Sequence, residues 1–115
     1  MIMNEISCQT RLSVLTYEIA RAAVMLHGYR VYLMSADRPS ITPGLPLAVA
    51  TANDLVLEAE QVSMDGPPEE TRQLITYLTD LLETVDALVE IASAYLPQAI
   101  DLSANAKRVL IGFSL

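Results

Sequence analysis

Two runs of apolar residues, each repeating every seven positions, constrain the fold of this 115-residue chain more than any other feature. Alternating steps of three and four residues return a side chain to the same side of an α-helix. Each run therefore predicts a long helix that packs against another helix. The first run consists of Leu12, Leu15, Ile19, Ala22, Leu26, Tyr29 and Leu33. The second run consists of Leu74, Leu78, Leu81, Val85, Leu88, Ala92 and Tyr95. The pattern predicts an all-α protein.

Helix start and stop signals set the boundaries of the first helix, which is predicted over residues 10–34. Thr10 or Ser13 can cap its first amides. Its end has two interpretations, because Gly28 is a stop signal and residues 28–34 alternate as a strand does, whereas the seven-residue register continues through the same segment. We favour the helix.

The middle of the chain begins with a connector over residues 35–46, in which three prolines exclude regular structure. A helical hairpin is predicted over residues 46–96, and only a short helix is expected in the C-terminal segment 97–115. The inner face of the second helix, which is expected to end near Met64, is predicted to be Val49, Ala52, Val56, Ala59 and Val62.

The third helix is predicted from Pro67 or Pro68 to Tyr95. A proline fits the first turn of a helix, where its missing amide leaves no bond unmade. Glu69 and Glu70 follow it and suit the positive end of the helix dipole.

The apolar content exceeds what a chain of this size can cover. Hydrophobic residues make up 52% of the sequence and the mean hydropathy is +0.36, although a small domain leaves a large share of its surface in water. Contact with a second polypeptide accounts for the excess. We therefore expect three long helices and a short C-terminal element in an intertwined or helix-exchanged homodimer, with a simple hairpin loop as the alternative role of the connector. The expected self-interface is Leu12, Leu15, Ile19, Ala22 and Leu26.

The first helix also carries large amphipathic or pliable side chains of the kind that concentrate in protein interfaces. The candidate partner-binding residues are Tyr17, Arg21, Met25, Tyr29, Arg30, Tyr32 and Met34. Arg21 lies one turn from Glu18, so the two side chains can also pair with each other. The residues alone leave open whether this set binds a partner or seals a dimer.

Charge and composition bear on several other functions. Seven basic residues against fourteen acidic ones give a net charge of −7, which argues against direct binding of nucleic acid. The sequence lacks the roughly 18 uninterrupted apolar residues of a membrane span, and Glu5 stands where a secretory leader is positive. The single Cys8 suits a reducing compartment. We expect a cytoplasmic protein without membrane contact.

No catalytic constellation is apparent in the sequence, and we expect neither enzymatic activity nor a cofactor or metal. The alternative is a metal-dependent enzyme related to helical nucleotide pyrophosphatases, because Glu83 and Asp86 match half of the metal motif of that class. The upstream Glu-x-x-Glu half is missing. The lone His27 has no evident acid or nucleophile beside it.

Residues 41–48, Ile-Thr-Pro-Gly-Leu-Pro-Leu-Ala, together with the alanine-rich helix that follows them and the Ala-Leu-Val run at 87–89, resemble a family of small helical proteins of unknown function in Gram-negative bacteria. The resemblance covers residues 39–92. In its size, its acidity and its long first helix the chain is also similar to quorum-sensing anti-activators of the QslA type. That similarity implies a regulatory protein that binds a LuxR-type transcription activator, covers the surface through which the activator dimerises, and so prevents DNA binding.

Overall fold

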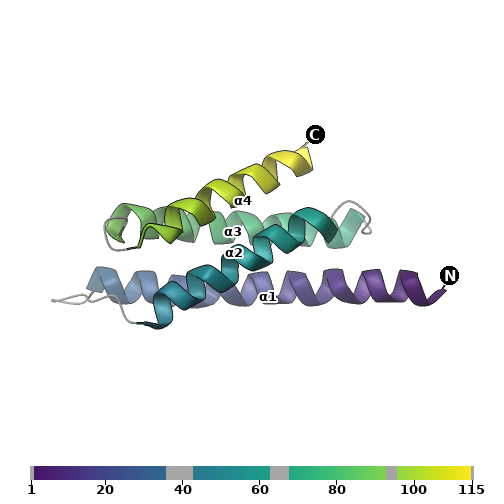
Figure 1. Ribbon diagram of the computed structural model, residues 1–115, viewed down its shortest axis with the longest axis horizontal. Helices are drawn as coiled ribbons and strands as arrows, with labels where there is room; N and C mark the ends of the chain where they lie inside the picture. The colour runs from purple at the N-terminus through teal and green to yellow at the C-terminus, as the bar shows by residue number, and fades with distance from the viewer. Residues whose placement is uncertain (1, 36–42, 63–67, 93–95, 115) are drawn as a thin grey trace.

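The computed structural model consists of four α-helices (Figure 1). It describes residues 2–35, 43–62, 68–92 and 96–114. The helices are α1 (Ile2–Ser35), α2 (Gly44–Val62), α3 (Pro68–Ala92) and α4 (Gln98–Ser114). The described ranges contain no strand, so the all-α prediction is confirmed.

The helices alternate in direction and form two layers. Figure 1 shows α1 and α3 running one way along the long axis and α2 with α4 returning in front of them. The main packing pairs are α1 with α2, α1 with α3, α2 with α4, and α3 with α4. The order around the core is therefore α1, α2, α4, α3, which is the arrangement of a four-helix bundle. Consecutive helices α2 and α3 pack on α1 and α4 rather than mainly on each other, unlike the predicted hairpin over residues 46–96.

Both predicted apolar runs contribute to the core. On α1, Leu12, Leu15, Ile19, Leu26 and Leu33 are buried, and on α3 the residues Leu74, Leu78, Leu81, Val85, Leu88 and Ala92 are buried. Ala22 and Tyr29 lie partly buried at the edge of this core, and Tyr95 lies outside the described residues. Both runs therefore find their partners within one chain.

The packing of α2 on α4 uses small side chains and polar links. Alanines lie fully buried on both helices, and their small volume lets helices approach closely. They are Ala52, Ala59, Ala99 and Ala106. Across the same pair of helices the Asn105 amide donates to Asn53 Oδ1 at 2.7 Å, and Arg108 forms a 2.8 Å ion pair with Glu60. The predicted inner face of α2 is confirmed at Val49, Ala52, Val56 and Ala59; the side chain of Val62 lies outside the description.

The start of α1 differs from the prediction. The helix begins at Ile2, so Thr10 and Ser13 lie inside it rather than at its N-terminal end. Hydroxyl residues are tolerated there because they can bond to the carbonyl one turn back, as Thr16 Oγ1 does to Leu12 O at 2.8 Å. Residues 28–34 are helical, which confirms the helix over the strand.

The boundaries after α1 also shift. Helix α2 begins at Gly44, so Pro46 occupies its first turn instead of ending the connector. Helix α3 starts at Pro68 with Glu69 and Glu70 in its first turn, as predicted. It is described as far as Ala92, and its predicted end at Tyr95 lies outside the described residues.

The largest error of the sequence-based prediction concerns the C-terminal segment. It forms a helix of 17 residues, α4, and not a short element. Its buried side chains fall at helical spacing, which explains why a full helix is stable there. They are Ala99, Leu102, Ser103, Ala106 and Val109. None of the helices, as far as the chain is described, is both long and apolar enough to cross a membrane.

Candidate protein-interaction surface

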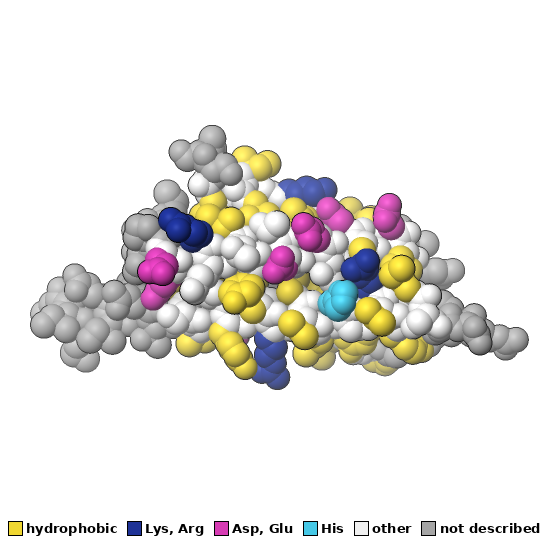
Figure 2. Space-filling view, turned by 180° about the vertical axis from the view of Figure 1, so that it is seen from behind, with side chains coloured by type: hydrophobic (Ala, Val, Ile, Leu, Met, Phe, Trp, Pro, Cys, Tyr) yellow, Lys and Arg dark blue, Asp and Glu magenta, His cyan; other side chains and the backbone are white. Residues whose placement is uncertain are grey.

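Helix α1 exposes apolar side chains on the side that faces away from the core. Of the thirteen large hydrophobic residues found exposed among the described side chains, α1 carries seven, and the other three helices together carry six. The seven are Val14, Tyr17, Val24, Met25, Val31, Tyr32 and Met34. In Figure 2 apolar side chains line the lower edge of the face, and others lie on its upper part among the acidic side chains. Helix α1 thus exposes large apolar residues on its outer side as well, where they lie among the charged Arg11, Glu18 and Arg21, although a bundle helix needs only one apolar side.

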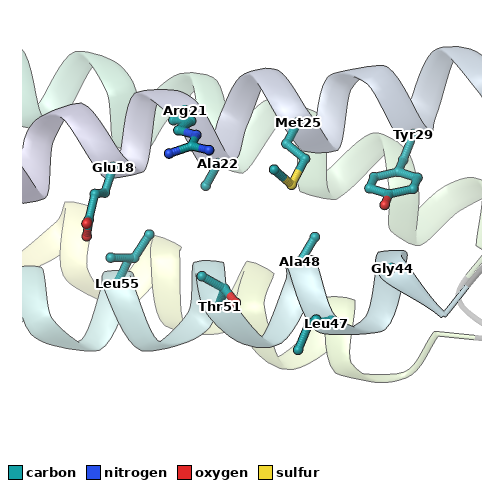
Figure 3. A pocket seen from close by; sticks show the side chains of 10 residues that line it. All are labelled: Glu18, Arg21, Ala22, Met25, Tyr29, Gly44, Leu47, Ala48, Thr51 and Leu55. Atoms are coloured by element: carbon teal, nitrogen blue, oxygen red, sulfur yellow. The ribbon is translucent and has the colours of Figure 1, made fainter.

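A groove of about 480 Å³ opens between α1 and α2 (Figure 3). We call it the α1–α2 groove. Its lining consists of Glu18, Arg21, Ala22, Met25 and Tyr29 from α1 and of Gly44, Leu47, Ala48, Thr51 and Leu55 from α2. Figure 3 shows the side chains of the two helices facing each other across the opening.

The groove exists because small residues face each other where larger ones would close it. In Figure 3 Ala22 on α1 stands opposite Thr51 on α2, and Ala48 on α2 stands opposite Met25. At one end, a Cβ built on Gly44 would lie 2.5 Å from the hydroxyl oxygen of Tyr29, so the glycine lets this ring lie over the start of α2. The result is an apolar depression that remains open to solvent.

Two opposite charges stand at the other end of the α1–α2 groove. Glu18 and Arg21 are both exposed and lie one turn apart on α1. Within the described part of the chain neither side chain forms an ion pair or a hydrogen bond, unlike Arg108 with Glu60. The Glu18–Arg21 pair that their spacing allows is therefore not formed. An exposed pair gains little over solvation, so both groups remain hydrated and available.

A second, more polar depression runs along the other side of α1, between α1 and α3. One part, of about 410 Å³, is lined by Ala20, Ala23, Val24, His27, Arg30, Tyr77, Asp80, Glu83 and Thr84. The adjoining part, of about 250 Å³, is lined by Ser13, Thr16, Tyr17, Ala20, Glu70, Gln73 and Tyr77. The Arg30 Nε atom is buried here without a hydrogen-bond partner among the described atoms.

The seven candidate partner-binding residues do not form one cluster. Arg21, Met25 and Tyr29 lie together in the α1–α2 groove. Tyr17 and Arg30 line the depression on the α3 side. The remaining two, Tyr32 and Met34, are exposed near the C-terminal end of α1.

The candidate self-interface lies mostly in the core of the single chain. Leu12, Leu15, Ile19 and Leu26 are at most 2% exposed, and Ala22 lies in the α1–α2 groove. A self-interface made of these leucines and Ile19 would require helices exchanged between copies, because a closed chain has already buried them.

Of the two acidic residues of the enzyme alternative, Asp86 has structural partners. Asp86 Oδ1 accepts a 2.5 Å hydrogen bond from Ser103 Oγ and lies 3.8 Å from Lys107 Nζ, so this carboxylate links α3 to α4. Glu83 lines the α1–α3 depression. Among the described side chains, no three His, Cys, Asp or Glu residues come together as a metal site would require.

Sequence reasoning missed several residues of this surface. The α2 side of the α1–α2 groove was not predicted, and Leu47 at its rim is 69% exposed. The exposed valines at 14, 24 and 31 were also missed, although they fall on helical spacing that a search for a second apolar side of α1 would have found.

Comparison with models of protein families, with curated proteins and with solved structures found no match to this chain. The surface is therefore interpreted from its own geometry.

Proposed function

We propose that this protein is a regulatory protein-binding module that binds its partner through the outer side of α1 and the adjoining α1–α2 groove. The observation that carries the proposal is the concentration of exposed large hydrophobic residues on α1. Several large apolar residues exposed on one helix of a small protein are characteristic of an interaction site.

The residue types on this surface support binding to protein. Tyr17, Met25 and Tyr32 are exposed, and aromatic and methionine side chains supply much of the energy of protein interfaces. Arg21 stands beside them as a donor for polar contacts at the rim. The net charge of −7 disfavours a nucleic acid as the partner.

The partner we propose is a LuxR-type transcription activator, as the resemblance to quorum-sensing anti-activators implies. The bound protein would cover the surface through which the activator dimerises, and the activator would then fail to bind DNA. A helix with an apolar outer side and a groove beside it is suited to cover another apolar surface. The proposed site of action is the cytoplasm.

Homodimerisation remains part of the proposal. An exchanged dimer would reuse the core contacts of the first apolar run between copies. A dimer of two closed chains would instead need an outer surface of the bundle.

The test compares two exposed residues on different helices. Tyr17 on α1 is 65% exposed and Ile111 on α4 is 62% exposed. We would titrate the ligand-binding domain of a LuxR-type activator with the wild-type protein by calorimetry, and follow binding of the activator to its DNA site in parallel. Tyr17→Ala should weaken the complex about tenfold or more, the effect of losing an aromatic interface residue, whereas Ile111→Ala should bind as the wild type does.

Two results would contradict the proposal. One is the absence of a complex between the wild-type protein and the activator domain. The other is a complex that Tyr17→Ala and Ile111→Ala weaken equally, because binding would then not depend on α1.

A further inference from the structure

We propose that a second copy of this chain docks on the outer side of α1 about a two-fold axis between Glu18 and Arg21, and that this dimer hides the partner-binding surface. The dimer follows from the surface of α1 alone. Its competition with the partner rests on the function proposed above.

A row of exposed residues on α1 carries the inference. Its members are spaced alternately by three and four positions, so they form one straight seam on the helix. We call this row the outer stripe. It consists of Arg11, Val14, Glu18, Arg21, Met25, Gly28 and Tyr32, all of which are exposed.

The outer stripe is complementary to a second copy of itself that runs in the opposite direction. In a two-fold dimer of antiparallel helices, residues equally distant from the axis face each other across the interface. With the axis between positions 18 and 21, Glu18 of each copy faces Arg21 of the other. Val14 likewise faces Met25. Each match occurs twice.

The next pair of facing residues outward from the two-fold axis is complementary in volume. Arg11 of one copy lies over Gly28 of the other, where a long side chain meets a residue without one. The space over Gly28 is open, because a Cβ built there has no heavy atom within 4 Å. The α1–α2 groove beside Met25 adds about 480 Å³ of room for side chains of the second copy.

Charge selects the antiparallel pairing of two copies over a parallel one. Glu18 and Arg21 lack an ion-pair partner in the described part of their own chain. A parallel pairing of two α1 helices in register would place Glu18 against Glu18 and Arg21 against Arg21. The antiparallel pairing satisfies both charges in both copies.

The dimer would exclude the partner. Arg21, Met25 and Tyr32 belong both to the outer stripe and to the candidate partner-binding set. A copy engaged in the dimer cannot offer them to an activator. The amount of free binding surface would then depend on the concentration of the protein.

The test uses charge-reversal variants, and sedimentation velocity measures the molar mass of each variant in solution. Glu18→Arg places Arg against Arg twice, and Arg21→Glu places Glu against Glu twice, so each variant should dimerise at least tenfold more weakly than the wild type. An equimolar mixture of the two variants should recover dimers, because their stripes complement each other. The double reversal Glu18→Arg/Arg21→Glu should recover them as well.

A matched control comes from α3. Glu90 is exposed and lies outside the outer stripe, so Glu90→Arg should dimerise as the wild type does. Circular dichroism confirms that each variant is folded. A wild-type protein that stays monomeric at high concentration would overturn the inference, and so would a dimer that survives both single reversals, which is the result expected of exchanged helices. Failure of the mixture to dimerise would also overturn it.

A separate measurement addresses the competition. When a LuxR-type activator domain is added to the wild-type dimer, light scattering should detect a complex with one copy of each protein. A complex with two copies of this chain would refute the competition. If no complex forms while the charge reversals behave as described, the proposed function fails and the dimer stands.

Discussion

The orientation of α1 about its own axis leads to a sharp prediction for two residues that lie two positions apart in the sequence. Leu26 is fully buried in the core, at 0% exposure, whereas Val24 is 72% exposed on the outer side. Residues two apart on an α-helix point in nearly opposite directions. Replacing each by alanine therefore removes side-chain volume from opposite sides of the same turn.

The two substitutions should differ greatly in cost. Leu26→Ala removes buried methyl groups and leaves a cavity, which costs about 3 kcal/mol in well-packed cores. In a domain of this size that corresponds to a fall in Tm of roughly 12 °C. Val24→Ala removes atoms that are mostly in water, and alanine favours the helix by about 0.5 kcal/mol over valine. Its net effect should be near zero or slightly stabilising.

Urea denaturation followed by circular dichroism measures both values, at a protein concentration low enough that the chain is monomeric. The expected outcome is a much lower midpoint for Leu26→Ala with an unchanged slope, and a wild-type midpoint for Val24→Ala. Equal losses of stability in the two variants would show that both sides of α1 are buried. The assignment of its outer side as a binding surface would then be wrong.

Three further substitutions test the packing. Gly28→Ala should stabilise the protein by about 0.5–1 kcal/mol, seen as a higher Tm, because alanine favours the helix and the space over Gly28 is open. Asn105→Ala should cost about 1 kcal/mol in urea unfolding, and a double-mutant cycle with Asn53→Ala should show coupling, because their amides share a 2.7 Å hydrogen bond. Ala106→Leu should lower the free energy of unfolding by roughly 1–3 kcal/mol, seen as a lower urea midpoint, because it overpacks a fully buried position. An unchanged midpoint would mean that α4 lies farther from its neighbours.

The sequence predicted the two long helices well because their signal is repeated. A seven-residue pattern that persists over several turns outweighs any single residue, so Gly28 did not end α1 although it is a stop signal by itself. The same logic explains the error at the start of α1. The capping preference of Thr10 or Ser13 is worth about 1 kcal/mol, and a helix that continues through them adds backbone hydrogen bonds for several further residues.

Helix α4 was underestimated because its buried side is weakly hydrophobic. Ala99 and Ala106 hold two of its buried positions and Ser103 holds another. Small residues are ambiguous in a sequence. Only the close approach of neighbouring helices turns them into a packing surface.

The candidate site was predictable in kind and not in arrangement. The large amphipathic residues of α1 were recognised, and most of them are exposed. Their division between the α2 side and the α3 side depends on where those helices pack, which the pattern of α1 does not state. The α1–α2 groove could not be predicted from the sequence, because it depends on small side chains at Ala22, Ala48 and Thr51 that lie on different helices.

The apolar surface that needs a second chain lies on a different side of α1 from the one that composition suggested. An apolar content of 52% suggested that the apolar runs themselves need a second chain. Every described member of these runs is instead buried or partly buried within one bundle. What remains is the outer side of α1, where large apolar residues continue although no helix of the same chain covers them. If α1 binds as proposed, fold and binding depend on different residues of one helix, and Glu18→Arg is expected to weaken association while the bundle stays intact.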